Sequence, residues 1–569
     1  MNKILEHLNA IYGQGVGHAT STKLQTILEN YRAHIPQQTA PLTERDALLI
    51  TYGDQVRQPN VPPLQSLGEF CDQHLLGIVS GIHLLPFYPF TSDDGFSVVD
   101  YRAVNPEFGT WDDVTRVGMH FRLMFDAVIN HISVSSNWFR GFLHDDPRYR
   151  DYFIVVPDGI DLSRVVRPRT LPLLTEFETP SGKKNVWTTF SADQVDLNYR
   201  NPDLLLDVLD TLLFYVAHGA GFIRLDAIAF LWKEFGTMCL HLAPTHRVIQ
   251  LIRAVLDAVA PHVILITETN VPHTDNMAYF GDGTNEAQMI YNFALPPLTL
   301  HTFRTGDATT LSRWASQLTL PSKRVTFFNL LASHDGIGLN PARGILGETE
   351  IDELVIQTQT HGGLVSYKTN PDGSTSPYEL NISYFDALSD PSANEPLATQ
   401  VDRFITAQAI MMSLVGVPGI YFHSLFGSRG WVEGVAQTGQ NRTINREKLG
   451  RAMLERELND PSSRRYQVFT RLVQLLRARA AHPAFAPTRA MQVIEGNPSV
   501  FTLLRGQADP QSILCLHNVS GTPQKVDVSG WDLFGGESSK RVDLITGILL
   551  DRSERVVLTP FQVLWLKHV

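Results

Sequence analysis

From about residue 45 onward, short and mainly apolar runs alternate with longer stretches of helical periodicity. Runs that are apolar throughout are typical of strands covered on both faces, as in a parallel sheet. Seven such runs lie at residues 48–52, 82–85, 122–125, 221–224, 263–266, 326–330 and 419–422. Repeated strand and helix units over this length predict an α/β fold, a (β/α)8 TIM barrel rather than an open sheet.

Two stretches interrupt this rhythm and predict insertions, and a third predicts a separate domain. Both insertions are rich in proline and in turn signals, and long insertions on a barrel usually carry function. The tail changes to short strands, which indicates an antiparallel β domain. The predicted order is 1–131 first part of the barrel, 132–200 inserted subdomain B, 201–339 barrel continued, 340–395 second insertion, 396–484 barrel end and 485–569 C-terminal antiparallel β domain.

The composition narrows the class of protein. Of 569 residues, 43% are hydrophobic and 18% are charged, which is typical of a compact folded chain. The net charge of -11, with no basic tract, argues against a nucleic-acid partner, because phosphate backbones are bound mainly by clustered Lys and Arg.

Location and cofactors are also constrained. The first residues lack the apolar stretch of a secretory signal, and the most apolar run, 409–422, is shorter than the roughly 20 residues that cross a bilayer. The three cysteines, Cys71, Cys239 and Cys515, have no metal-ligand spacing and indicate reduced thiols. We therefore expect a cytoplasmic monomer or homodimer with no membrane contact, no metal and no nucleotide cofactor.

Polar side chains follow several of the predicted strands at the point where each strand ends. They are Asp126, Asn130, His131, Arg224, Asp226, Glu268, His334 and Asp335. Because the carboxyl ends of barrel strands form one face, these groups should converge in a single cleft. Several carboxylates around one cleft suit glycosyl transfer, in which one acid attacks the anomeric carbon and another exchanges a proton with the leaving oxygen.

Each of these residues also has a structural interpretation. A lone Asp after a strand is often a helix cap or a turn former, and Asp126 and Asn130 could be structural. Arg224 and Asp226 point to the same side of one strand and could form only a buried ion pair. Four successive strand ends of this kind favour the catalytic interpretation.

At these residues the chain resembles glycoside hydrolase family 13, the α-amylase clan. Its four signature stretches look like residues 126–131, 221–227, 264–270 and 329–335. The resemblance implies that Asp226 is the nucleophile, Glu268 the general acid/base and Asp335 a third acid that holds sugar hydroxyls. It also implies that Arg224, His131 and His334 position the carboxylates and the sugar.

The expected chemistry is consistent with these roles. Arg224 beside Asp226 should lower the pKa of that carboxyl and keep it ionised. Partial burial and two neighbouring acids should raise the pKa of Glu268, so that it is protonated near neutral pH.

Within that family, the chain is most similar to the sucrose phosphorylase subfamily. The similarity is carried by residues 86–89, 93–96, 194–198, 334–338 and 378–381. It implies that Asp93 accepts a glucose hydroxyl and that Phe96 is an aromatic platform, with Gln194 and Arg446 in the same pocket. Core packing of Phe96 and a turn at Asp93 are the alternatives.

Residues 230–234, 338–344 and 376–379 resemble instead the branch that acts on 2-O-α-D-glucosylglycerol or 2-O-α-D-glucosylglycerate. In that branch Tyr378 and Glu379 would lie at the acceptor, with Glu379 accepting from the hydroxyls of a small polyol. Arg343 or Lys233 could bind an acceptor carboxylate or phosphate, and both could equally be surface charges.

The sequence thus predicts a retaining glycoside phosphorylase that converts a small α-glucoside and phosphate to α-D-glucose 1-phosphate through a covalent intermediate, with phosphate as co-substrate and no cofactor. The alternatives are a sucrose or sucrose 6'-phosphate phosphorylase, or a hydrolytic or transglycosylating α-glucosidase. A non-catalytic sugar-binding barrel is a third class, but all three acids are present.

Overall fold

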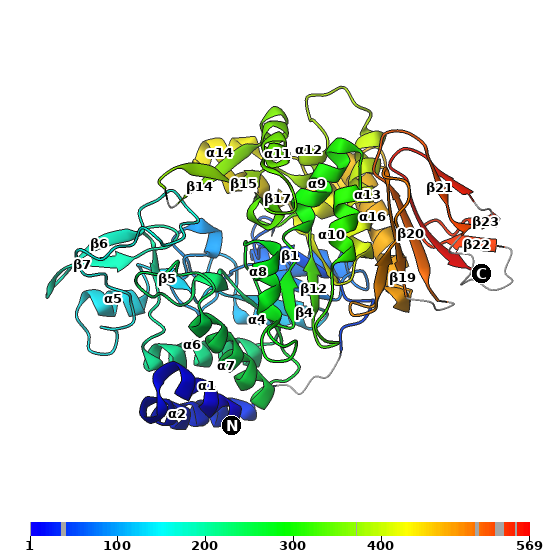
Figure 1. The fold of residues 1–569 in the computed structure, drawn as a ribbon. Coiled ribbons are helices and arrows are strands. Elements are labelled where there is room, and N and C mark those ends of the chain that lie inside the picture. Colours follow the sequence, from blue (N-terminus) through cyan, green and yellow to red (C-terminus); the bar gives the residue numbers. More distant parts are fainter. Residues whose placement is uncertain (1, 36–40, 371, 507–510, 530–539, 552–554) are drawn as a thin grey trace.

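The computed structural model describes residues 2–35, 41–370, 372–506, 511–529, 540–551 and 555–569. Its centre is a closed barrel of eight parallel strands (Figure 1). They are β1 (Leu48–Thr51), β3 (Gly81–Leu84), β4 (Arg122–Ala127), β9 (Ala220–Leu225), β10 (Ile264–Thr267), β11 (Met289–Tyr291), β12 (Thr326–Asn329) and β16 (Val417–Tyr421). Strand β16 pairs with β1 and closes the ring, which confirms the predicted TIM barrel.

The barrel strands explain the apolar runs of the sequence. Every residue of β1, β3, β12 and β16 is buried, because the barrel interior covers one face and helices cover the other. The strand that sequence analysis did not name is β11, whose three residues are too few to stand out as a run.

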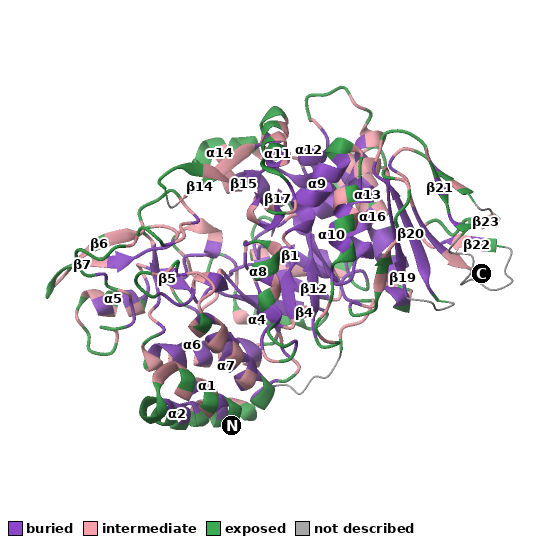
Figure 2. Cartoon of the chain, in the orientation of Figure 1, coloured by how far each residue is buried: buried purple, intermediate pink, exposed green. Residues whose placement is uncertain are grey.

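Helices surround the barrel on its outer face (Figure 1). They include α3 (Pro63–His74), α4 (Trp111–Gly118), α6 (Pro202–Ala217), α7 (Ala243–Val259), α9 (Leu295–Thr305), α10 (Thr309–Ser316), α13 (Leu397–Ser413) and α16 (Arg464–Ala480). Helix α6 begins where the Asn201 side chain accepts from the backbone N–H groups of Asp203 and Leu204, with Pro202 in the first turn. Figure 2 shows the buried residues gathered in the barrel and on the inner sides of these helices.

Two helices precede the barrel. α1 (Asn2–Tyr12) and α2 (Gln14–Arg32) pack against α7 and α6, at the bottom of Figure 1. The first barrel strand begins only at Leu48, so these helices form an outer layer beside the barrel.

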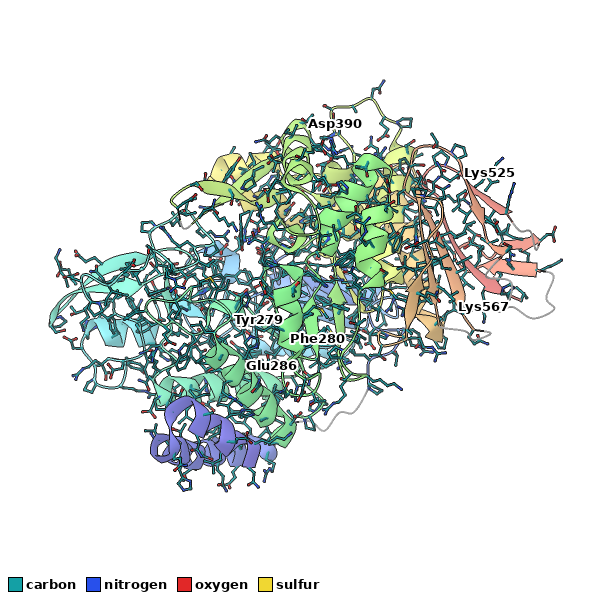
Figure 3. All side chains as sticks on the ribbon, in the orientation of Figure 1. Tyr279, Phe280, Glu286, Asp390, Lys525 and Lys567 are labelled. Carbon is teal, nitrogen blue, oxygen red and sulfur yellow. The ribbon has the colours of Figure 1, made fainter. Side chains whose placement is uncertain are left out.

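The segment between β10 and β11 fixes α7 to the barrel. It contains α8 (His273–Met277) and the short helix η3 (Ala278–Phe280). Tyr279 stacks on His246 of α7, Phe280 packs on Phe327 of β12, and Glu286 accepts from His246 at 2.9 Å. Tyr279, Phe280 and Glu286 are labelled in Figure 3.

The stretch 132–200 folds into small sheets and one helix. The elements are β5 (His131–Ser133), α5 (Asn137–Leu143), β6 (Leu174–Thr179), β7 (Gly182–Trp187) and β8 (Gln194–Asp196), with β5 paired to β8 and β6 to β7. The stretch 340–395 contains η4 (Asn340–Ala342), α11 (Glu348–Thr360), β14 (Leu364–Thr369), β15 (Thr375–Asn381) and α12 (Tyr384–Leu388). Strand β15 also pairs with β13 (Ile337–Gly338), and a bridge between Arg167 and Thr369 joins the two insertions.

Short elements follow the last barrel strand and lead to the C-terminal domain. They are η5 (Phe422–Phe426), α14 (Val432–Thr438), η6 (Asn441–Asn445), β17 (Leu449–Gly450), which pairs with β2 (Val56–Arg57), α15 (Arg451–Leu458) and η7 (Pro483–Phe485).

The C-terminal domain is antiparallel, as predicted. One sheet has the order β18 (Met491–Val493), β19 (Val500–Arg505), β20 (Ile513–Asn518), β25 (Val563–His568), β22 (Lys540–Asp543) and β23 (Leu549–Asp551). A second pairs β21 (Gln524–Asp527) with β24 (Arg555–Leu558). Strand β20 packs against α13, which connects this domain to the outer layer of the barrel. Within the described ranges, none of the helices is long and apolar enough to span a bilayer.

Candidate active site

A cavity of about 720 Å³ opens at the carboxyl ends of the barrel strands. Ten of the candidate residues line it: Asp93, Phe96, His131, Gln194, Asp226, Glu268, His334, Asp335, Tyr378 and Glu379. Arg224 and Arg446 contact acids of this lining, whereas Lys233 and Arg343 do not reach the cavity. The barrel therefore brings together side chains that lie far apart in the sequence.

Arg224 connects the carboxylates at the floor of the cavity. It is 1% exposed, and its Nη1 lies 2.8 Å from Oδ1 of Asp226 and also donates to Asp126. Its Nη2 lies 3.8 Å from Oε2 of Glu268. Asp126 is held from its other oxygen by Nε2 of His83 at 2.7 Å. The ion pair of Arg224 and Asp226 is thus buried, as the structural interpretation required, and its acid lines the cavity.

The environment of Glu268 suits a general acid/base. Burial raises its pKa to about 7, and the negative charges of Asp226 and Asp335 act in the same direction. Arg224 and the backbone N–H of Ala227, which donates to Oε2 at 2.9 Å, oppose this rise. A carboxyl that titrates near neutral pH can both give and take a proton.

Asp226 differs from the expectation that Arg224 would lower its pKa. Burial raises the pKa of Asp226 above its ordinary value, and Arg224 and His131 lower it by less. Arg224 nevertheless lies 2.8 Å from Asp226 and 3.8 Å from Glu268, so its charge favours ionisation of Asp226 over that of Glu268. The two acids therefore compete for one proton, and geometry assigns it to Glu268.

The third acid, Asp335, lies against two guanidinium groups and one imidazole. Its Oδ1 lies 2.6 Å from Nη1 of Arg442, 3.5 Å from Nη2 of Arg446 and 3.5 Å from Nε2 of His334. Burial raises the pKa of Asp335, but Arg442, His334 and Arg446 together hold it below its ordinary value. Burial lowers the pKa of His334 to about 3, so its imidazole is neutral near pH 7. Asp335 is accordingly an ionised hydrogen-bond acceptor.

Phe96 and its neighbours form one wall. Its ring stacks on His334 with centroids 4.8 Å apart and planes at 3°. Its carbonyl oxygen lies 2.9 Å from Nε2 of His131 and accepts from Nε2 of Gln194 at 3.0 Å. Phe96 is therefore both part of the buried core and part of the cavity lining.

Asp93 also combines both interpretations. It begins the helical turn η1 (Asp93–Gly95) with φ of 52°, a left-handed conformation that Asp tolerates better than most residues. Nη1 of Arg446 lies 3.4 Å from Asp93 and 2.7 Å from Asp94. The turn places the Asp93 carboxylate in the cavity lining.

The structure contradicts the acceptor role considered for Lys233 and gives none to Arg343. Lys233 is 6% exposed, and its Nζ lies 2.5 Å from Asp196 and 2.7 Å from the Asn130 side-chain oxygen. Arg343 pairs with Glu348 at 2.6 Å on the outer side of the second insertion. Both cations form ion pairs with carboxylates that the sequence pattern did not connect to them.

Glu379 lines the cavity and has an ion-pair partner that the sequence did not indicate. Its carboxylate is 1% exposed and accepts from Nε and Nη2 of Arg442, at 3.0 and 2.9 Å. The charge expected to receive acceptor hydroxyls is therefore already paired. Arg442 was not identified from the sequence, where the only hint was its spacing of four residues from Arg446.

Arg169 is the second residue that sequence analysis missed. It comes from the stretch 132–200, lines the cavity and lies over the ring of Tyr378, 6.0 Å from the centroid. It forms no ion pair with a carboxylate of the described chain. Tyr378, 8% exposed, lines the same part of the cavity. Arg169 is therefore a cation at the cavity with no counter-charge from the residues that the structure describes.

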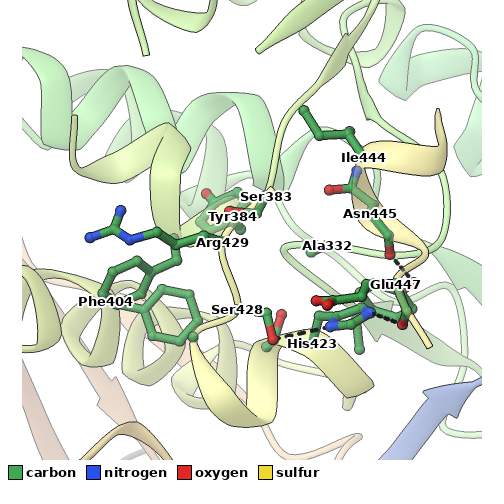
Figure 4. A pocket seen from close by; sticks show the side chains of 14 residues that line it. Ala332, Ser383, Tyr384, Phe404, His423, Ser428, Arg429, Ile444, Asn445 and Glu447 are labelled. Atoms are coloured by element: carbon green, nitrogen blue, oxygen red, sulfur yellow. Dashed lines mark hydrogen bonds between the residues drawn. The ribbon is translucent and has the colours of Figure 1, made fainter. Parts of the chain in front are cut away.

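A second cavity of about 350 Å³ lies behind the segment 441–447 (Figure 4). His423 bridges it, with Nδ1 3.1 Å from the Ser428 hydroxyl and Nε2 3.0 Å from the Glu447 carbonyl oxygen. Burial lowers the pKa of His423 to about 3, so this wall carries a neutral imidazole. This cavity backs the segment that carries Arg442 and Arg446 and is separate from the acids. In the described ranges, His, Cys, Asp and Glu form no cluster that could hold a metal ion.

Comparison with known proteins finds a matching family and similar curated relatives. The family described as the catalytic domain of α-amylase matches residues 74–336. A glucosylglycerate phosphorylase from Allomeiothermus silvanus is 51% identical over 563 residues, covering 99% of this chain and 98% of the relative. One from Escherichia coli is 46% identical over 570 residues, covering 99% of this chain and 100% of the relative.

Other relatives are more distant. A sucrose phosphorylase and a glucosylglycerol phosphorylase are 31% and 29% identical, over 77% of this chain in each case. The crystal structure of the sucrose 6F-phosphate phosphorylase from Thermoanaerobacter thermosaccharolyticum has a TM-score of 0.74 at 23% identity and covers 84% of this chain and 95% of that one. That structure shares the fold.

Proposed function

Since the chain belongs to the α-amylase family, glycoside hydrolase family 13, and within it to the glucoside phosphorylases, we propose that it cleaves 2-O-α-D-glucosylglycerate with phosphate to α-D-glucose 1-phosphate and glycerate. The observation that carries the choice of glycerate is the identity of about half of all positions, over nearly the whole chain, with relatives of that activity. Relatives that act on sucrose or glucosylglycerol share far fewer positions.

In the first step, the protonated carboxyl of Glu268 donates to the glycosidic oxygen while Asp226 attacks the anomeric carbon. The bond to glycerate breaks as the bond to Asp226 forms, and glycerate leaves with the proton. The pKa of Glu268, raised to about 7 by burial, supports the role of proton donor. One guanidinium in contact with both acids supports the short carboxyl separation of a retaining enzyme.

In the second step, an oxygen of hydrogen phosphate attacks the same carbon and displaces Asp226, and the phosphate proton passes to Glu268, which restores the acid for the next cycle. Two inversions retain the α configuration, so the product is α-D-glucose 1-phosphate. Phosphate brings its own nucleophilic oxygen and charge, and it serves as co-substrate with no cofactor required.

Both leaving glycerate and incoming phosphate are anions, and each must approach a site that holds three acids. Arg169 supports their binding, because it faces the cavity over Tyr378 without a carboxylate partner in the described chain. A guanidinium matches a carboxylate or a phosphate with two parallel hydrogen bonds. The three buried free thiols support the proposal that the enzyme works in the reducing cytoplasm.

The test is a phosphorolysis assay with glucosylglycerate, glucosylglycerol and sucrose, each with and without phosphate. We expect glucose 1-phosphate chiefly from glucosylglycerate, and only when phosphate is present. A preference for sucrose would overturn the choice of acceptor. Release of free glucose at the same rate without phosphate would overturn the phosphorolytic step.

A further inference from the structure

Arg442 joins two acids that approach the site from different segments. It belongs to η6, whereas Asp335 follows β12 and Glu379 lies in β15. Its Nε and Nη2 each donate to one oxygen of Glu379, and its Nη1 lies 2.6 Å from Asp335. The guanidinium thus grips one carboxylate with two parallel bonds and presents its remaining edge to the other.

The surrounding backbone holds this arrangement in place. A Cβ on Gly336 would lie 2.5 Å from Cγ of Glu379, so glycine lets the Glu379 side chain lie directly beside Asp335. The amide of Asn441 donates to the Ser366 hydroxyl of β14 at 3.3 Å, and that of Asn445 donates to the Asp335 carbonyl at 3.3 Å. The segment of Arg442 is therefore fastened on both sides of the guanidinium.

From these contacts we infer that Glu379 is a positioning residue, which fixes the Arg442 guanidinium on Asp335, and that it does not select the acceptor. Each Glu379 oxygen already accepts a charge-assisted hydrogen bond from Arg442, and the side chain is 1% exposed, so little of the carboxylate is left open to a polyol hydroxyl. Of the positive charges that hold the pKa of Asp335 below its ordinary value despite burial, Arg442 has the largest effect.

The two roles considered for Glu379, positioning Arg442 and binding the acceptor, predict different effects on the reactions of the enzyme. An acceptor-binding Glu379 would matter only in reactions that contain glycerate. A Glu379 that positions Arg442 would matter in every transfer of the glucosyl group, because Asp335 belongs to the sugar site whatever the second substrate is. The inference rests on glucosyl transfer between substrate and phosphate and does not depend on which glucoside is natural.

The experiment compares two reactions of Glu379→Gln: phosphorolysis of glucosylglycerate, and exchange of labelled phosphate into α-glucose 1-phosphate without any glycerate. We expect kcat to fall by about a hundredfold in both, because displacement of a positioned group by about 1 Å has that effect, while the KM for glycerate in synthesis stays unchanged. Exchange at the wild-type rate with a raised KM for glycerate would overturn the inference.

Two further variants keep the test independent of folding. Glu348→Gln makes the same change on an exposed acid of the same insertion and should leave both reactions unchanged. Glu379→Asp keeps the charge but shortens its reach, and it should lose exchange as Glu379→Gln does. If Glu379→Asp retained full exchange, the geometric argument would be wrong.

A double-mutant cycle gives a second measurement. If Glu379 acts only through Arg442, then Glu379→Gln combined with Arg442→Gln should lose no more exchange activity than Arg442→Gln alone. Independent, multiplying losses would contradict the inference. Should glucosylglycerate prove not to be the substrate, the exchange reaction would still give this result, so the two proposals fail separately.

Discussion

Replacing Glu268 by Gln should make the protein more stable at alkaline pH while it removes the proton donor. Burial raises the pKa of Glu268 from 4.5 to about 7, so the folded protein holds this proton more tightly than the unfolded chain does. The stability that this proton contributes to the wild type is therefore complete below about pH 4.5, and it is lost as the pH rises through about 7. Gln resembles the protonated acid and carries no such cost.

The size of the effect follows from the same two pKa values. A difference of about 2.5 units corresponds to about 3 kcal/mol at about 1.4 kcal/mol per unit. The stabilisation of Glu268→Gln relative to wild type should be under about 1 kcal/mol at pH 5 and should reach about 3 kcal/mol at pH 8. The amide can still accept from the backbone N–H of Ala227, so no buried partner is left unsatisfied.

The assay is denaturant unfolding of both proteins at several pH values between 5 and 8, followed by one probe of the barrel. Glu234→Gln, on an exposed acid, is the matched control and should have the stability of the wild type at every pH. Phosphorolysis by Glu268→Gln should fall by about 10²–10⁴-fold, and wild-type cleavage should decline above about pH 7 as the donor ionises. A Glu268→Gln protein that is destabilised by the same amount at every pH would refute this reasoning.

Three other substitutions test the ion pairs of the site. Lys233→Met should destabilise the fold by about 3–5 kcal/mol in denaturant unfolding, because it leaves the charge of Asp196 buried without a cation. The substrate KM of the folded protein should not change. A raised KM would show that Lys233 belongs to the acceptor site. Arg343→Ala should cost less than about 1 kcal/mol and leave KM unchanged, since it removes an ion pair whose acid is 74% exposed. Arg169→Ala should raise the KM for phosphate and for glucosylglycerate by about tenfold or more in initial-rate assays, because it removes a charged hydrogen-bonding partner of both anions. Unchanged KM values would exclude Arg169 as the anion-binding group.

The parts of the fold and the site that follow from strand order could be predicted from the sequence. Apolar runs locate seven barrel strands because their residues are covered on both faces, and the three-residue β11 is too short for such a signal. Asp226 and Glu268 follow neighbouring strands β9 and β10, so the parallel register alone places them side by side.

Residues whose roles depend on the packing of insertions could not be predicted. Arg169 and Arg442 reach the cavity from segments with no regular register against the barrel, and the Glu379 partner lies 63 positions away. Lys233 could be taken for a free cation because no sequence pattern near it indicates that Asp196 is its partner. For a charged side chain, the contact that decides its role is a long-range one.

The central claim is that Asp226 forms a covalent bond to the glucosyl group. Its most direct test uses Glu268→Gln protein with α-glucosyl fluoride, a donor that needs no protonation of its leaving group, followed by rapid quenching, digestion and mass spectrometry. The account predicts one added glucosyl unit on the peptide that contains Asp226, and none in a protein that also carries Asp226→Asn. An adduct on another residue, or release of product without any adduct on Asp226, would contradict it.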